Sequence, residues 1–295
     1  MPSRRSLSTT LLSVVAIAAV SLISGLTTTG AAPTSNSGAS VSASVQTHND
    51  KGNNGNGNNN NNGNNGHGNG NGKSGTVTVY LTRHGETWMN VGHRMQGWSD
   101  SPLTAKGELV ATQLGVGLSK AGVKFEAAYS ADMLRHSSTA ALALAQLKFK
   151  GEAVRDAGLR EVAFGSFEGA LQSEAQKAAI PYLKGATFND FLDALVAANT
   201  AAGSPLLAET APQLTVRTMA SLNAIAAKQS KAGGGNVLVV SSGITIIAAL
   251  EAMGADTSTL PAGIGNAAVN KLEYKNGTWT VLSMNDLSYV EAGTK

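Results

Sequence analysis

Cysteine is absent from this chain of 295 residues. The chain can therefore form no disulfide and no thiolate metal site, and it has no cysteine nucleophile or lipid-bearing N-terminal cysteine. Aromatic residues make up only 5% of the sequence and charged residues 14%, which predicts a core of aliphatic side chains. The net charge is only +3, and no run of Lys and Arg with interleaved aromatics supports nucleic-acid binding.

Long apolar runs are also scarce, and the clearest one extends from Leu11 to Leu26. Arg4 and Arg5 precede it, and the small residues Gly30-Ala31-Ala32 follow it. This order is typical of a secretory signal peptide. The run is short for a membrane span, so we predict that residues 1–32 are cleaved rather than kept as a membrane anchor, with no stable membrane span afterwards. The mature chain is then expected to be secreted or to lie at the extracellular cell surface.

Residues 33–75 are rich in Ser and Thr and then consist almost entirely of Asn and Gly. Such a segment cannot bury enough apolar surface to offset the entropy lost on ordering. We predict a disordered linker, through which the protein could associate with a cell surface. Residues 76–295 are long enough for one α/β domain with a sizeable core.

Apolar patterning divides this domain into alternating strands and helices. Strands are predicted at 77–81, 127–130 and 237–240, helices at 104–121, 132–144 and 244–253, and a hairpin at 269–284 that turns at Asn276-Gly277. The alternation predicts a three-layer α/β/α sandwich with a mostly parallel sheet. Ligands of such sheets bind beyond the carboxyl ends of the strands.

Arg83-His84-Gly85 follows the first predicted strand directly. An imidazole at this place can attack phosphorus and form a phosphohistidine. The neighbouring guanidinium can hold phosphoryl oxygens through paired hydrogen bonds, and a glycine allows the backbone to approach the phosphate closely. This arrangement predicts phosphoryl-transfer chemistry.

Four segments of the chain resemble the histidine phosphatase superfamily, the phosphoglycerate mutase-like proteins of branch 1. They run in the family's order: Tyr80 to Thr87 with Asn90, Gln96-Gly97 and Pro102-Leu103-Thr104; Ser130 to Arg135; Leu159-Arg160-Glu161; and Asn285-Asp286. The resemblance implies that His84 is the nucleophile and that Arg83 and Arg135 hold the phosphoryl group. It also implies that Glu161 donates and accepts the proton, with Asn90 and Thr87 as additional phosphate contacts.

One position departs from the family pattern. After the predicted strand at 237–240, the family has a Ser-His-Gly turn whose histidine stabilises the phosphoryl group, whereas this chain reads Ser241-Ser242-Gly243. A serine hydroxyl can donate a hydrogen bond but brings no positive charge. His136 is a candidate substitute, but adjacent helical residues point about 100° apart. If Arg135 faces the site, His136 is therefore expected to point largely away from it.

The resemblance implies a phosphomonoesterase that acts through a phosphohistidine on His84, and the signal-like residues 1–32 predict that it is exported. Its activity could be impaired, because Ser242 replaces the second catalytic histidine. The expected substrate is a small phosphorylated molecule, with no cofactor and no metal. Two alternatives stay open. The chain would be an impaired or inactive pseudophosphatase that binds phosphate-bearing ligands, or it would be a phosphoglycerate mutase-type phosphotransferase.

Overall fold

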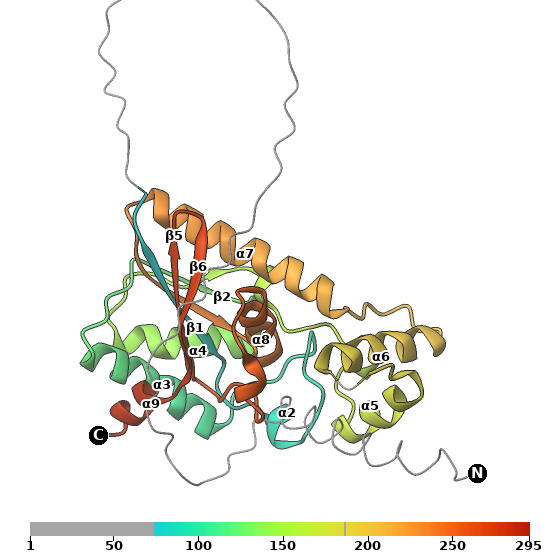
Figure 1. Ribbon diagram of the computed structural model, residues 1–295. Helices are drawn as coiled ribbons and strands as arrows, with labels where there is room; N and C mark the ends of the chain where they lie inside the picture. Colours follow the sequence, from blue (N-terminus) through green and yellow to red (C-terminus); the bar gives the residue numbers. More distant parts are fainter. Residues whose placement is uncertain (1–73, 186) are drawn as a thin grey trace, which may run out of the picture.

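The computed structural model describes residues 74–185 and 187–295, so the predicted signal peptide and nearly all of the predicted linker lie outside the described residues. No helix within the described ranges is long and apolar enough to cross a membrane. The elements follow one another along the chain (Figure 1) as β1 (Val77–Arg83), α2 (Trp88–Val91), α3 (Ala105–Lys120), β2 (Ala127–Ser130), α4 (Leu134–Gln146), β3 (Val154–Arg155), α5 (Gln172–Ala179), α6 (Phe188–Ala201), α7 (Ala211–Lys231), β4 (Gly235–Ser241), α8 (Gly243–Ala252), β5 (Val269–Lys275), β6 (Thr278–Asp286) and α9 (Ser288–Gly293).

The strands form one six-stranded sheet in the order β3-β2-β4-β1-β5-β6. Neighbouring strands are parallel from β3 to β1, whereas β5 and β6 are antiparallel. Helices α7 and α8 pack on one face of the sheet, and α3, α4 and α9 pack on the other. The predicted three-layer α/β/α sandwich with a mostly parallel sheet is confirmed.

Strand β4 shows why the sheet is covered on both faces. Val237 and Val239 belong to the core under α7 and α8, while Leu238 and Val240 belong to the core under α3 and α4. Successive side chains of a strand point to opposite faces, so a run of four apolar residues requires a helix layer on each side. The same pattern supplied the prediction of this strand.

Two local predictions differ from the structure. Strand β3 was not predicted, because its two residues form an exposed edge without a continuous apolar run. The helix predicted at 132–144 begins only at Leu134, so Asp132 lies outside it; the residue at the N-cap is Met133, with no side-chain capping bond. The Asp132 carboxylate instead forms a bidentate pair with the Arg160 guanidinium, at 2.6 and 2.7 Å. An acidic residue before a helix has the pattern of a cap, but here the charge of Arg160 is the stronger partner.

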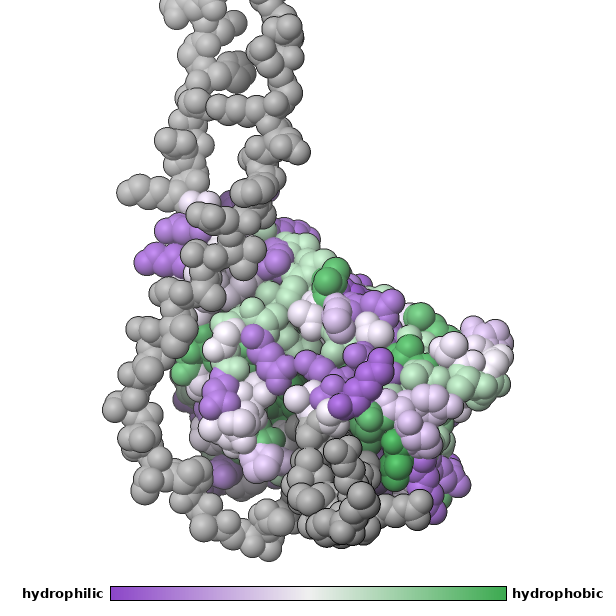
Figure 2. Space-filling model, turned by 45° about the vertical axis from the view of Figure 1, so that its right-hand side comes forward, coloured by the Kyte–Doolittle hydropathy of each residue, from purple (hydrophilic) through white to green (hydrophobic). Residues whose placement is uncertain are grey.

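Helices α5 and α6 form a pair beside the sheet rather than on one of its faces (Figure 1). They share a second apolar cluster with Phe164 and Ile244, which lie close to the carboxyl ends of the strands. Figure 2 shows green apolar residues interspersed with purple polar ones over the surface that this side of the molecule presents. The pair is thus fixed to the body through the same residues that border the strand ends.

The last helix, α9, lies against α3 near the C-terminus (Figure 1). Gly117 of α3 makes this close approach possible, because a Cβ there would overlap the carbonyl group of Tyr289. Val290 completes the contact from α9 by entering the core beneath α3 and α4. The C-terminal residues are therefore part of the packed domain.

Candidate active site

His84 lies one residue beyond the end of β1, between the carboxyl ends of two parallel strands. Its backbone N–H donates to the Ser241 carbonyl of β4 at 3.0 Å, and its side chain is only 3% exposed. The ring Nδ1 lies 2.7 Å from the Gly85 carbonyl oxygen. A carbonyl only accepts, so Nδ1 carries the hydrogen, and Nε2 of the neutral ring keeps its lone pair. This tautomer suits nucleophilic attack by Nε2.

The surroundings of His84 keep the ring neutral. Burial lowers its pKa well below the ordinary value, and the positive charges of Arg135 and Arg83 lower it further. At neutral pH the ring therefore holds an unprotonated nitrogen without needing a base to remove a proton.

A glycine contact holds the loop that carries His84. The N–H of Gly85 donates to the Thr139 hydroxyl of α4 at 2.9 Å. Gly107 in the first turn of α3 touches the same loop, and a Cβ there would overlap the Glu86 carbonyl oxygen. Thr104 is the N-cap of α3, and its side chain accepts from the Gly107 N–H. The loop is thus held between the first turn of α3 and helix α4.

Arg83 is buried beside His84 and donates from one terminal nitrogen to the Ile264 carbonyl at 2.6 Å. Its Nε has no hydrogen-bond partner. Burial lowers the pKa of Arg83 to about 10, which leaves the guanidinium charged at neutral pH. A buried N–H without an acceptor is costly, so this donor is suited to an anionic ligand.

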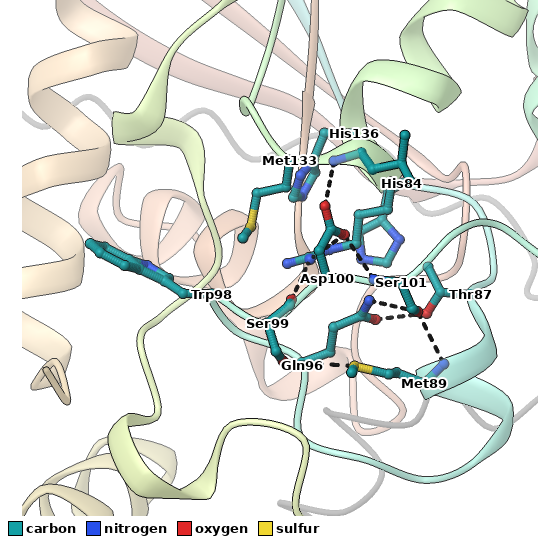
Figure 3. Close-up of polar contacts among 12 residues, drawn as sticks. His84, Thr87, Met89, Gln96, Trp98, Ser99, Asp100, Ser101, Met133 and His136 are labelled. Atoms are coloured by element: carbon teal, nitrogen blue, oxygen red, sulfur yellow. Dashed lines mark hydrogen bonds and ion pairs between the residues drawn. The ribbon is translucent and has the colours of Figure 1, made fainter. Parts of the chain in front are cut away.

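Arg135 enters from the first turn of α4 and is fully buried. Its terminal nitrogens donate to the carbonyls of Gly97 and Ser99, at 2.7 and 2.9 Å, and to the Asp100 carboxylate at 3.1 Å. Its Nε, like that of Arg83, is without a partner. Figure 3 shows Asp100 and the adjacent loop residues gathered below His84 and His136.

The Glu161 carboxylate is buried at the N-terminus of α8. It accepts from the backbone N–H groups of Val162, Ile244 and Thr245, and from the Thr245 hydroxyl, at 2.9 to 3.1 Å. Burial raises its pKa, although these hydrogen bonds act in the opposite direction. Such a group can hold a proton at higher pH than an ordinary glutamate, as a general acid requires.

Thr87 and Asn90 form the capping box of the short helix α2. The Thr87 hydroxyl donates to the Gln96 side chain at 2.7 Å, as Figure 3 shows, and accepts from the Asn90 N–H. Thr87 is fully buried and does not line the cavity described below, whereas Asn90 does. The structure therefore brings Asn90, but not Thr87, to the cavity surface.

A cavity that opens to solvent lies over these groups. Among the predicted site residues, Arg83, His84, Asn90 and Glu161 line it, while Arg135 and Ser242 are buried without lining it. Gly243 of the turn after β4 also lines it, and the remaining lining residues, Arg94, Gln96, Phe164 and Ile244, were not predicted as site residues. Arg94 is the informative addition, since it brings a cation to the cavity; only its proximity to the Arg83-His84 motif could have suggested it.

Ser242 and His136 form a pair that corrects one expectation. His136 is fully buried, its Nε2 lies 2.7 Å from the Ser242 hydroxyl oxygen, and its ring stands perpendicular to that of His84 with centroids 5.2 Å apart. The prediction that His136 points away from the site is wrong. Arg135 and His136 both lie in the first turn of α4. The Arg135 side chain turns toward the loop at 97–100, while His136 lies beside His84.

The Glu168 side chain accepts from four backbone N–H groups: those of Gly97, Trp98, Ser99 and Phe164. Glu168 therefore fixes the loop at 97–99, and the Gly97 and Ser99 carbonyls of this loop accept hydrogen bonds from Arg135. In the part of the chain that the structure describes, no three His, Asp or Glu side chains are grouped as metal ligands.

Comparison with known proteins gives consistent matches. The model of the histidine phosphatase superfamily (branch 1) matches residues 79–287. The probable phosphoglycerate mutase GpmB of Proteus mirabilis is 31% identical over 210 residues, which cover 68% of this chain and 86% of that protein. A broad-specificity phosphatase of Saccharomyces cerevisiae, YOR283W, is 34% identical over 39% of this chain. The chain spans about half the length of that phosphatase and of several other curated relatives it matches.

Among solved structures, the phosphoglycerate mutase of Bacillus anthracis superposes with a TM-score of 0.68 at 37% identity. The superposition covers 76% of this chain and 99% of that protein. The shared fold thus extends over essentially the whole of that structure and most of the described residues here.

Proposed function

The chain belongs to branch 1 of the histidine phosphatase superfamily, and on that premise we propose that it is a phosphomonoesterase acting through a phosphohistidine on His84. The observation that carries the proposal is the set of buried donors beside a neutral imidazole. The Nε groups of Arg83 and Arg135 are buried without partners, and both arginines act electrostatically on His84. A phosphoryl group at this place would supply the missing acceptors.

The first step follows from the tautomer and from Glu161. His84 Nε2 attacks phosphorus, the N–P bond forms, and the bond from phosphorus to the ester oxygen breaks. Glu161, whose pKa is raised by burial, gives its proton to the departing oxygen. The two guanidinium groups balance the charge on the phosphoryl oxygens.

The second step returns the site to its starting state. The Glu161 carboxylate takes a proton from water, the water oxygen attacks phosphorus, and the N–P bond breaks. His84 Nε2 recovers its lone pair, and inorganic phosphate leaves. Charge stabilisation by arginine means that these steps need no metal or organic cofactor.

The cavity favours a small phosphomonoester as substrate. Arg94 is the one cation of its lining besides Arg83, and the remaining lining residues are polar or apolar and uncharged apart from His84 and Glu161. Lys177 and Lys184, the basic residues of the α5–α6 region, are exposed and do not line it. A heavily anionic substrate would require more cations than this.

Replacement of the nucleophile tests the proposal. The full chain is expected to release phosphate from an aryl phosphate and to form an acid-labile, alkali-stable phosphoprotein, and His84→Ala should abolish both, because it removes the attacking nitrogen. Undiminished turnover by His84→Ala would overturn the mechanism. A chain that binds phosphate but shows neither turnover nor phosphoprotein, with His84 intact, would be a pseudophosphatase.

Transfer to a second alcohol separates hydrolysis from mutase chemistry. The names of several relatives make the mutase alternative specific. If phosphate from a phosphoglycerate appears on another hydroxyl of the product faster than it appears in solution, the chain is a phosphotransferase. Faster release of inorganic phosphate supports the phosphatase.

Export of the phosphatase is part of the proposal, supported by the signal-like pattern of residues 1–32. The mature protein is expected in the culture medium or at the cell surface, beginning after about residue 32. Cell fractionation with N-terminal mass determination checks this, and an intact chain in the cytoplasm would contradict it.

A further inference from the structure

The residue after β4 is Ser242, where the family pattern has a histidine, but the imidazole of His136 lies next to it. Register pairs Ser241 with Arg83 across the parallel strands, so Ser242 follows beside His84. Ser242 is buried, and its hydroxyl lies 2.7 Å from Nε2 of His136. The ring of His136 in turn stands perpendicular to the ring of His84, with centroids 5.2 Å apart (Figure 3).

The Ser242 hydroxyl does not cap helix α8, although Ser242 occupies the N-cap position. Ser242 is the N-cap of α8, with φ −118° and ψ 164°, but its side chain makes no capping bond. Serine at this position ordinarily accepts from the N–H groups two or three residues later. Here Glu161 accepts from both Ile244 and Thr245. The hydroxyl is therefore free to pair with His136.

The charges around His136 suit an imidazole that receives an anion. Burial lowers the pKa of His136 well below its ordinary value in the unliganded site. The nearby Arg135, His84 and Arg160 lower it further. Its Nδ1 is buried without a hydrogen-bond partner. A phosphoryl group on His84 would add negative charge beside this ring, and a nearby negative charge favours the protonated imidazole.

We infer that His136 supplies the second imidazole of the phosphoryl site from helix α4, and that Ser242 positions it through the Nε2–Oγ hydrogen bond. The inference rests on the proposed phosphatase function. In this arrangement the imidazole comes from the first turn of α4 and not from the turn after β4.

The role of His136 can be tested by removing its imidazole and placing a histidine at position 242 instead. Turnover of an aryl phosphate is measured with the full chain as given, His136→Ala, Ser242→His and the double variant. His136→Ala is expected to lower kcat by about 10²- to 10³-fold, the usual effect of removing one preorganised group that stabilises charge, with a small change in KM. Ser242→His in the His136→Ala background should recover at least tenfold of that loss.

Two further variants separate this role from support of the fold. His136→Gln retains an amide that can hydrogen-bond to Ser242, so a purely structural role predicts near-normal kcat, whereas loss of the imidazole predicts a kcat close to that of His136→Ala. Ser242→Ala keeps the imidazole and removes only its positioning bond, so a smaller loss, about tenfold, is expected. Thermal unfolding midpoints of all variants establish that the compared proteins are folded.

The outcomes distinguish the two proposals. If His84→Ala is inactive while His136→Ala and His136→Gln keep kcat within threefold, the phosphatase stands and the role of His136 is overturned. The same holds if His136→Ala loses activity and Ser242→His restores none of it in a folded protein. If neither the chain as given nor Ser242→His releases phosphate or forms a phosphoprotein, the phosphatase function itself is overturned.

Discussion

Glu161 shows how one side chain can meet opposing requirements. Its carboxylate accepts from three backbone N–H groups and one hydroxyl, which would ordinarily stabilise the ionised form. Complete burial acts more strongly and raises its pKa. The residue is thus held in one orientation by bonds that are specific to the carboxylate while its proton affinity stays high. Orientation and proton affinity are set by different surroundings.

Glu161→Gln tests the proton-transfer role. With an aryl phosphate, whose leaving group needs no proton, the variant should show a burst of phenol followed by turnover about 10²- to 10⁴-fold slower, because water is no longer activated. Phosphoprotein should accumulate. Stopped-flow measurement of phenol release checks this.

Glu209→Gln is the matched control, because Glu209 is also a buried carboxylate and accepts from the Ala163 N–H and from Arg217. It does not line the cavity. The control should lower stability without producing a burst. A burst in neither variant, with equal steady-state rates, would contradict the role of Glu161.

At the scale of elements, the loop between α2 and α3 links the Glu168 carboxylate to the Arg135 guanidinium. Glu168 holds the N–H side of residues 97–99, and Arg135 holds the carbonyl side of Gly97 and Ser99. The guanidinium is therefore positioned by a loop that is itself positioned by a distant carboxylate. In the proposed function, Arg135 would hold the phosphoryl group in a position that depends on Glu168, which does not line the cavity.

Glu168→Gln should weaken this arrangement. Its amide nitrogen cannot accept from the loop N–H groups, so the free energy of unfolding should fall by about 1–3 kcal/mol, and KM for the aryl phosphate should rise more than kcat falls. Urea unfolding and steady-state kinetics measure both. Glu108→Gln, at an exposed position in the first turn of α3, is the control and should change stability by less than about 0.5 kcal/mol. Equal effects of the two variants would contradict the role of Glu168.

For the whole molecule, the two buried histidines connect stability to pH. The pKa values of His84 and His136 are lowered in the folded protein, so below pH about 6.5 the unfolded chain binds protons that the folded chain excludes. Their contribution to stability is complete above that pH and is lost as the pH falls. Glu161 acts in the opposite direction, because its raised pKa lets the folded state bind a proton first.

The variant His136→Gln isolates the contribution of His136 to the pH dependence of stability. The free energy of unfolding of the chain as given should fall more steeply between pH 6.5 and 5 than that of the variant, by up to about 1.4 kcal/mol per pH unit. Urea unfolding at several pH values gives the two slopes. Identical slopes would mean that His136 is protonated in the folded protein.

Much of this architecture was predictable from the sequence, because parallel strands buried on both faces leave continuous apolar runs such as Val237 to Val240. The Arg83-His84 motif at a strand end likewise identified the edge of the sheet that carries the site. The position of His136 was not predictable. It depends on how far the Arg135 side chain turns toward residues 97–100, and helical periodicity alone places the two residues on different faces.

Because α9 packs on α3, a tag or surface attachment at the C-terminal end of the domain is expected to have a different effect from one at the N-terminal end. Gly117 lets α9 lie directly on α3, and Gly107 at the other end of α3 touches the loop that carries His84. Helix α3 therefore connects the C-terminal helix to the loop that carries His84, and we expect a load at the C-terminus to act on that loop. An affinity tag, surface attachment or fusion partner joined after Lys295 pulls on that helix, whereas the same addition placed before Gly75 enters at the opposite, amino end of β1. Immobilised forms of this protein are best attached through the N-terminal side.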